Sequence, residues 1–150
     1  MKKGEGYELD RNKEAEKITF TFKSVSEQRT INKIIEFKEI SNSTWNLGFG
    51  DEKEDGWEDN VISNNDDLRK VLQTVVNAVY EFLNIYPRAN ILIYPLDYQR
   101  KLLYNRIFQI RWQEIEANFI VNGFIEDDID VSFEKYNPKK VFDYFVIKLK

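Results

Sequence analysis

Hydrophobic and polar residues alternate in three successive segments near the start of the chain. In residues 17–24 the isoleucine and the two phenylalanines occupy every second position, with polar side chains between them, and residues 30–40 and 45–49 repeat the pattern. Successive side chains of a strand point to opposite faces of a sheet, so the alternation predicts three half-buried strands. Their short connections favour an antiparallel meander.

A different period follows after a polar stretch. Apolar residues recur every three or four positions between Leu68 and Tyr86, which makes one apolar stripe on a helix. Asn64 or Asn65 can cap the first amides of this helix, and Pro87 ends it.

The remaining expected elements are short strands and a second helix. Residues 91–94 predict a brief strand, and Asp97 caps a second helix over about residues 98–117. This helix carries Leu103, Ile107 and Ile110 on successive turns. Four further strands are expected, the first of them short: 61–62, 119–121, 131–133 and 141–149, the last with Phe145 on an inner face and Phe142 on the other.

The element order is therefore β-β-β-(β)-α-β-α-β-β-β, which predicts the α+β class. The expected architecture is an antiparallel sheet, with an N-terminal meander and C-terminal strands, and two helices packed on one face. The 150 residues fit a single domain, 1–150, in which the charged residues 1–16 form a loosely held arm.

Composition narrows the possible chemistry. The chain has no histidine and no cysteine, so the commonest general base, the commonest metal ligand and any thiol nucleophile are missing. Its net charge of -4 works against a protein whose main task is gripping nucleic acid, and it suits a protein partner with a basic surface. No apolar leader follows Met1 and no apolar run approaches about 20 residues, so we expect a cytoplasmic protein without membrane contact.

The acidic loop over residues 51–60 is the first candidate metal site. A calcium loop starting at Asp51 would need oxygen ligands at its third and twelfth positions, which hold Lys53 and Ile62. No metal is therefore expected, and no cofactor motif is present, because Gly48-Phe49-Gly50 runs into acidic residues instead of a phosphate-binding helix.

The second predicted helix carries a cationic face. Arg100, Tyr104 and Arg111 fall within about 40° of one another at 100° per residue. Such a face can hold a phosphate or a carboxylate. Alternatively, these arginines are solvated, or pair with Glu114 or with the acidic loop.

Anions also favour the exposed amides at a helix start, which is where Asn64 and Asn65 stand. The candidate ligand-binding residues are Asp51, Asn64, Asn65, Arg100 and Tyr104. No catalytic residue is identified.

Several segments of the chain form a specific combination of motifs: Asn46-Leu47-Gly48-Phe49-Gly50-Asp51, Ser63-Asn64-Asn65 with Asp67, Lys70-Val71-Leu72, Thr74-Val75, Val79-Tyr80-Glu81-Phe82, Tyr86-Pro87, Arg100 with Tyr104, Glu114-Ile115, Phe119 with Val121 and Gly123, and Phe133-Glu134-Lys135 with the terminal strand. Together they resemble a family of small bacterial domains of about this length and of uncharacterised function. The resemblance covers residues 7–150 and implies an α+β fold and a bacterial origin, without an activity. Pro95-Leu96-Asp97 stand where the family has a Gly-Ser-Thr-like stretch, and Leu102 stands where it has an arginine.

These observations favour a small acidic bacterial protein that acts by binding another protein, in a setting such as toxin–antitoxin, immunity or phage conflict. The alternative is an enzyme or ligand binder that acts on a nucleotide, RNA or another phosphate-bearing substrate. Missing histidine and cysteine make the enzyme the second choice.

Overall fold

The computed structural model describes residues 5–53, 56–58 and 67–150. In these ranges nine strands form one sheet, accompanied by two helices. The elements are β1 (Asp10–Lys13), β2 (Lys17–Val25), β3 (Thr30–Ser41), β4 (Thr44–Lys53), β5 (Gly56–Glu58), α1 (Leu68–Ile85), β6 (Asn90–Ile93), α2 (Tyr98–Asn118), β7 (Phe119–Glu126), β8 (Val131–Lys135) and β9 (Tyr144–Leu149).

The sheet runs in the order β1-β2-β3-β4-β6-β9-β7-β8, and β5 pairs with the end of β4. Every pair is antiparallel except β4 and β6, which run parallel over three residues. The predicted α+β class and element order are confirmed. The sequence pattern predicted neither β1 nor the parallel pair, and the expected strand at residues 61–62 lies outside the described residues.

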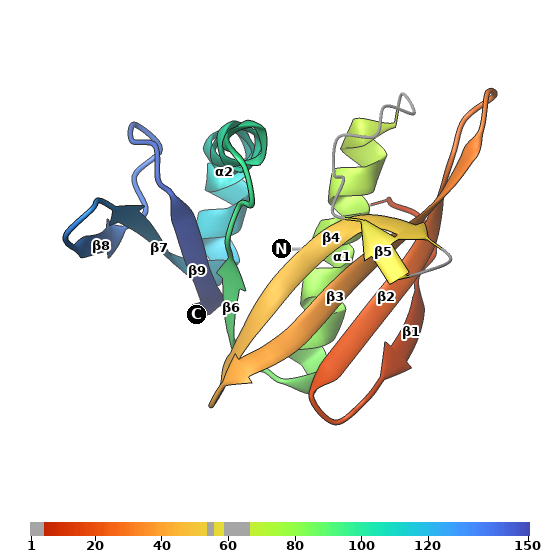
Figure 1. The fold of residues 1–150 in the computed structure, drawn as a ribbon, viewed down its shortest axis with the longest axis horizontal. Helices are drawn as coiled ribbons and strands as arrows, with labels where there is room; N and C mark the ends of the chain where they lie inside the picture. Colours follow the sequence, from red (N-terminus) through yellow and green to blue (C-terminus); the bar gives the residue numbers. More distant parts are fainter. Residues whose placement is uncertain (1–4, 54–55, 59–66) are drawn as a thin grey trace.

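The sheet opens between β4 and β6, so that its two halves diverge (Figure 1). Helix α1 lies against the half made by the N-terminal strands, and α2 accompanies the half made by β6, β9 and β7 (Figure 1). Within the described residues, no helix is long and apolar enough to cross a membrane.

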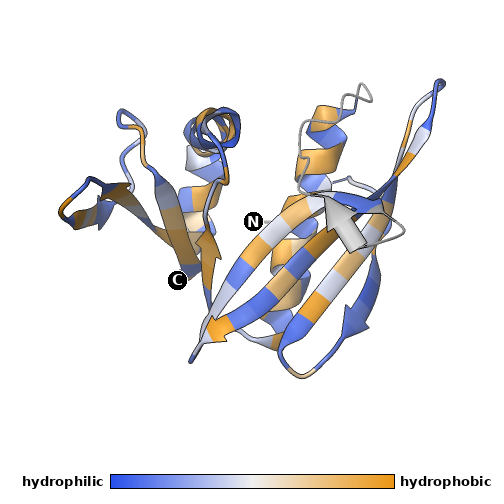
Figure 2. Cartoon of the chain, viewed as in Figure 1, coloured by the Kyte–Doolittle hydropathy of each residue, from blue (hydrophilic) through white to orange (hydrophobic). Residues whose placement is uncertain are grey.

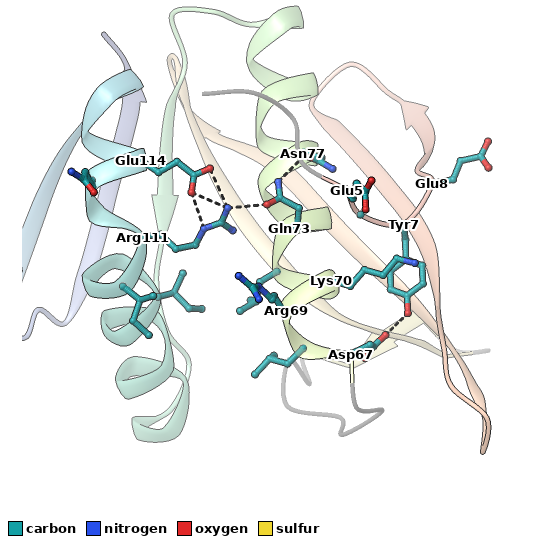
Figure 3. Close-up of a pocket in the computed structure, with 16 residues that line it drawn as sticks. Glu5, Tyr7, Glu8, Asp67, Arg69, Lys70, Gln73, Asn77, Arg111 and Glu114 are labelled. Carbon is teal, nitrogen blue, oxygen red and sulfur yellow. Dashed lines mark hydrogen bonds and ion pairs between the residues drawn. The ribbon is translucent and has the colours of Figure 1, made fainter.

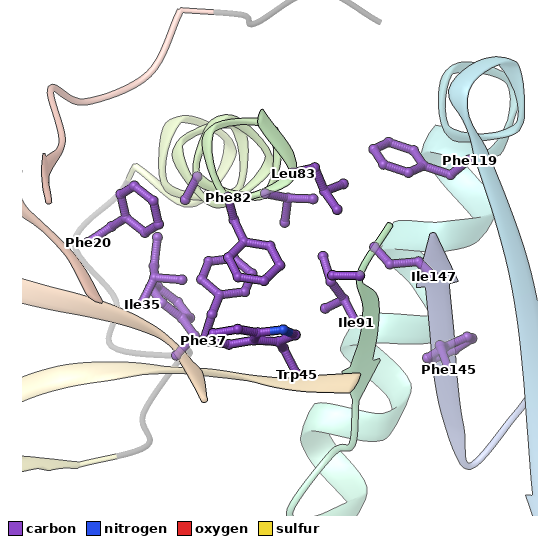
Figure 4. Packing of buried hydrophobic residues seen from close by; sticks show 14 of the residues in the cluster. Phe20, Ile35, Phe37, Trp45, Phe82, Leu83, Ile91, Phe119, Phe145 and Ile147 are labelled. Atoms are coloured by element: carbon purple, nitrogen blue, oxygen red, sulfur yellow. The ribbon is translucent and has the colours of Figure 1, made fainter. Parts of the chain in front are cut away.

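Alternation decides which side chains enter the core. Figure 2 shows hydrophobic and hydrophilic positions alternating along β2 and β3, and the residues of β2 that point inward, such as Ile18 and Phe20, are fully buried. Aromatic rings fill the centre of the core (Figure 4). The ring of Phe82 of α1 stacks on that of Phe37, with 4.3 Å between the ring centres, and its centre lies 5.1 Å from that of Trp45. Burying such rings stabilises the sheet–helix contact more than helix propensity does.

The N-termini of the two helices are capped differently. Asp97 caps α2 as predicted, because its side chain accepts from the Arg100 N–H over 2.8 Å. Helix α1 begins at Leu68 after Asp67, whose side chain makes no capping bond. Asn64 and Asn65, which were expected to cap it, lie outside the described residues.

The apolar residues on successive turns of the second helix do not mark its buried face, and one expectation about burial is wrong. Ile110 is 70% exposed, and the buried residues of α2 are Asn105 and Phe108. Phe142 was assigned to an outer strand face, but it precedes β9 and is fully buried. Its ring covers Gly123, where a Cβ atom would lie 2.4 Å from the ring.

The segment expected to be a loose arm contacts the fold from Gly6 onward. The Tyr7 N–H donates to Thr74 Oγ1 over 2.8 Å, and a Cβ atom on Gly6 would lie 2.8 Å from the same oxygen. Residues 10–13 then form β1, the first edge of the sheet. Charged residues can form an edge strand because both faces of β1 are exposed.

Candidate functional site

A groove of about 1620 Å³ separates the two helices on the face away from the sheet (Figure 3). Leu72 and Gln73 line it from α1, and Ile107 and Ile110 line it from α2. The segment from Glu5 to Glu8 adds residues along α1. The two helices lie against different halves of the sheet. Because these halves diverge, the helices are held apart and the groove lies between them.

An apolar pocket of about 130 Å³ lies beneath the groove, between the helices and the sheet. Leu72 and Ile107 line both spaces, so the groove and the pocket adjoin at these two side chains. The sheet contributes Phe49 from β4 and Ile93 from β6, the two strands that diverge here. Apart from the Tyr104 hydroxyl, the lining side chains are hydrocarbon, so the pocket suits an apolar group: Leu47, Phe49, Leu72, Val75, Val76, Val79, Ile93, Tyr104, Ile107, Phe108, Ile115, Phe119 and Ile147.

One polar bridge crosses the groove. Arg111 of α2 donates to Gln73 Oε1 of α1 over 2.8 Å and pairs with Glu114 at 3.0 Å (Figure 3). Gln73 in turn donates to Asn77 Oδ1 over 3.1 Å. Side chains of both helices therefore meet through hydrogen bonds at this point, where a guanidinium can serve two acceptors at once.

Two tyrosines, Tyr7 at the groove and Tyr80 on α1, have raised pKa values and are therefore not suited to act as bases. Burial raises the pKa of Tyr80 to about 12, with the nearby Glu114 carboxylate as the second cause. Burial likewise raises the pKa of Tyr7, and the hydrogen bond to Asp67 adds to the shift. Both phenols therefore stay protonated near neutral pH.

A polar cluster holds the N-terminal segment against the start of α1. Asp67 Oδ2 accepts from the Tyr7 hydroxyl and from Ser24 Oγ, each over 2.5 Å. The Lys70 ammonium stands 4.3 Å from the centre of the Tyr7 ring, within cation–π range. The cluster borders the groove, because Tyr7, Asp67 and Lys70 also line it.

Asp51, one of the predicted ligand residues, lies inside the fold. It faces Lys33 across β3 and β4, and its carboxylate is 2.5 Å from the Lys33 ammonium. The side chain of Lys33 is 1% exposed and that of Asp51 is 9% exposed. Sequence reasoning missed Lys33, although a signal existed: it shares the parity of Ile35 and Phe37, which placed it on the inner face.

The other predicted ligand residues do not come together in this groove. Arg100 pairs with Asp97 in the first turn of α2, and among the described residues it lines neither the groove nor the pocket, as is also true of Asp51. Tyr104 lines the apolar pocket. Asn64 and Asn65 lie outside the described residues.

The cationic face of α2 was expected to hold an anion, to be solvated or to pair with acidic residues of the chain. Arg111 forms the internal pair with Glu114 that was one of these expectations. In the described ranges, no group of three or more acidic side chains is arranged to hold a metal ion.

Comparison with known proteins identifies one family. The model described as "Family of unknown function (DUF6934)" matches residues 3–150. No curated protein and no solved structure matches the chain. The match agrees with the resemblance in length and coverage that the sequence motifs indicated.

Proposed function

The chain belongs to the family of unknown function DUF6934, and we propose that it acts by binding another protein in the groove between α1 and α2. The observation that carries this proposal is an open groove whose apolar floor leads into an apolar pocket. Exposed apolar side chains along it support the proposal, with Ile110 at 70% and Leu68 at 50% exposure.

The dimensions favour a polypeptide over a small molecule. Small-molecule sites occupy about 300–1,000 Å³, and this groove has about 1620 Å³. The pocket beneath has about 130 Å³, close to the roughly 150 Å³ cavity that holds one benzene ring. A peptide segment in the groove can therefore place one leucine- or phenylalanine-sized side chain in the pocket, as helix-in-groove complexes do.

Charge around the groove supports a partner with polar flanks. Arg69 and Lys70 line it together with Glu5, Glu8 and Asp67, so both signs are present. The whole chain carries a net charge of -4. A partner with a basic surface would meet it faster, because opposite fields steer encounter.

This proposal ranks above an enzyme or binder of a phosphate-bearing substrate. The raised pKa values of Tyr7 and Tyr80 leave them as hydrogen-bond donors, and the chain has no histidine to serve as a base. The Arg100–Asp97 pair in the first turn of α2 gives Arg100 a structural role. A bacterial setting such as toxin–antitoxin, immunity or phage conflict is part of the proposal, because an acidic binding domain suits a basic target.

Partner capture with a groove variant tests the proposal. Ile110→Glu places a charge on the groove without disturbing the core, because Ile110 is largely exposed. Partners captured from a lysate of the source organism are identified, and affinity for the purified partner is measured by calorimetry. We expect at least about a tenfold loss of affinity, since a central apolar anchor commonly contributes more than 1.4 kcal/mol.

Ile40→Glu is the matched control. Ile40 is 53% exposed near the end of β3 and does not line the groove, so this variant should retain the partner and melt at the same temperature as Ile110→Glu. Equal binding by both variants would show that the groove is not the interface. A protein that captures no partner but turns over a nucleotide or RNA would refute the proposal as a whole.

A further inference from the structure

Four aromatic rings form a row across the sheet face that the helices leave uncovered. Tyr94 comes directly after β6, and its ring centre lies 5.1 Å from that of Tyr144 of β9. The ring centre of Tyr144 lies 4.6 Å from that of Phe124 of β7. Phe124 lies 5.3 Å from Phe133 of β8. Because β6, β9, β7 and β8 are neighbours in that order, the row ends at Phe133 on the last strand.

The rings cover one another, so the row is no platform for nucleobases. The rings of Tyr144, Phe124 and Phe133 are stacked, with interplanar angles of 8° and 24° between neighbours, and the ring of Tyr94 is tilted by 35° to that of Tyr144. Base stacking needs an open ring face. Within the described residues Phe133 stacks on Phe124 alone, and it is 68% exposed, so the row is incomplete at the sheet edge.

The two edges of the sheet differ in a way that points to β8 (Figure 1). At one edge, β1 reads Asp-Arg-Asn-Lys, with every residue exposed and polar, and it is blue throughout in Figure 2. Charged edge strands discourage pairing with other chains. At the other edge, β8 exposes Val131 by 48% and Phe133 by 68%, and Ile129 before it is 96% exposed. This edge therefore exposes apolar side chains, which β1 does not, although Glu134 and Lys135 of β8 are charged.

We propose that a second copy of this chain pairs with β8, so that two sheets join edge to edge about a two-fold axis. In an antiparallel pairing centred on Phe133, the Phe133 rings of the two copies are directly opposite one another. Val131 then faces Lys135, and Ser132 faces Glu134. The aromatic row of each copy continues into that of the other.

The charges of β8 permit this self-pairing. In the centred register no two residues of the same charge are directly opposite, and Glu134 already pairs with Lys140 of its own chain at 3.0 Å. Like charges directly opposite destabilise a strand pair, so their absence favours a second copy as the occupant. A two-fold axis also satisfies the closed symmetry that most homo-oligomers adopt.

The dimer is expected to be weak. The pairing joins strands of five residues, which is a small interface, and a Kd of about 10–100 μM is appropriate to that size. The interface shares no residue with the groove between α1 and α2, so this proposal and the proposed function can fail independently.

Sedimentation equilibrium of the full chain tests the association, and engineered cysteines test the register. The chain has no cysteine of its own, so Val131→Cys and Lys135→Cys each introduce one thiol at an exposed position of β8. Mild oxidation of the two variants mixed together should give a disulfide-linked dimer. Each variant alone should not, because identical positions lie about 13 Å apart in the centred register, at about 3.3 Å per residue.

Phe133→Lys should weaken the dimer at least tenfold, because it places two like charges opposite each other. Ile40→Lys, on an exposed position outside β8, should leave the dimer unchanged. A chain that stays monomeric up to about 1 mM, ten times the upper Kd, would overturn the proposal, even if a strand of another protein were captured at this edge. Cross-linking that is equal in every mixture would also overturn it.

Discussion

The ring of Phe142 leaves no room for a side chain at position 123, which is glycine. A Cβ atom at this position in β7 would lie 2.4 Å from the ring of Phe142, far inside van der Waals contact. Both residues are buried, so the ring has little room to move away. We therefore expect that Gly123→Ala lowers the free energy of unfolding by about 2–3 kcal/mol, as overpacking of a core does, measured by denaturant titration.

A double-mutant cycle separates steric overlap from a loss of backbone freedom. In a Phe142→Leu background the side chain facing Gly123 is smaller, so Gly123→Ala should cost less there than in the native chain. An equal cost in both backgrounds would mean that the ring contact is not the cause.

At the residue scale, strand parity shows which side chains point inward, but it does not show which partner they meet. The inward position of Asp51 follows from the alternation of β4, and Lys33 follows from that of β3. Their pairing depends on the register between the two strands, which no local pattern states. Asp51 was named as a candidate ligand-binding residue, whereas the structure buries it against Lys33.

At the element scale, α2 depends on a polar side chain more than on an apolar stripe. Asn105 is 2% exposed and grips the backbone before β9: its Oδ1 accepts from the Phe142 N–H, and its Nδ2 donates to the Phe142 carbonyl, each over 2.8 Å. Nδ2 also donates to the Lys101 carbonyl over 2.8 Å. This side chain therefore joins α2 to the segment that covers Gly123.

We expect that Asn105→Leu destabilises the protein by about 3 kcal/mol, although leucine fits a helix well. The substitution leaves the Phe142 N–H and C=O buried without partners, and each such group costs about 1–3 kcal/mol. Thermal or denaturant unfolding measures the loss. Leu102→Ala, at an exposed position of α2, is the control and should change stability by less than about 0.5 kcal/mol; a loss no larger than in this control would contradict the clamp.

The periodic stripe of α1 predicted its position correctly, and that of α2 did not predict its buried face. Val71, Phe82 and Leu83 of α1 are buried as their spacing requires. In α2, Ile110 faces solvent at the groove, and Asn105 occupies the core. Hydrophobic spacing indicates a buried face only when a helix is covered along that face, and α2 borders a groove.

At the scale of the whole molecule, Asp143 connects α2 with the C-terminal strands. Its Oδ1 lies 2.6 Å from the Lys101 ammonium, and its Oδ2 accepts from the Glu126 N–H over 2.7 Å. Burial acts to raise the pKa of this carboxyl, but these contacts outweigh it and hold the pKa below its usual value.

The sign of the pH dependence follows. A carboxyl with a lowered pKa in the folded state contributes stability above the unfolded pKa of about 3.9, and that contribution is lost as the pH falls through the folded value. Asp143→Asn should therefore lower the melting temperature at pH 7, and the difference from the native chain should shrink below about pH 4. A parallel series with Glu116→Gln, an exposed residue of α2, should show no such difference. A gap for Asp143→Asn that is constant with pH would contradict the assignment.

The sequence by itself determined the class of fold, the order of its elements and most of their boundaries, because alternation and helical spacing are local properties of the chain. The tertiary structure alone decided that β4 and β6 run parallel and then diverge, and hence that a groove lies between the helices. It also decided that Asp51 meets Lys33 and that Phe133 ends an aromatic row at an open edge. A pattern states which face of an element is apolar; which elements then meet depends on pairings between residues far apart in the chain, and these form only when the whole sheet is assembled.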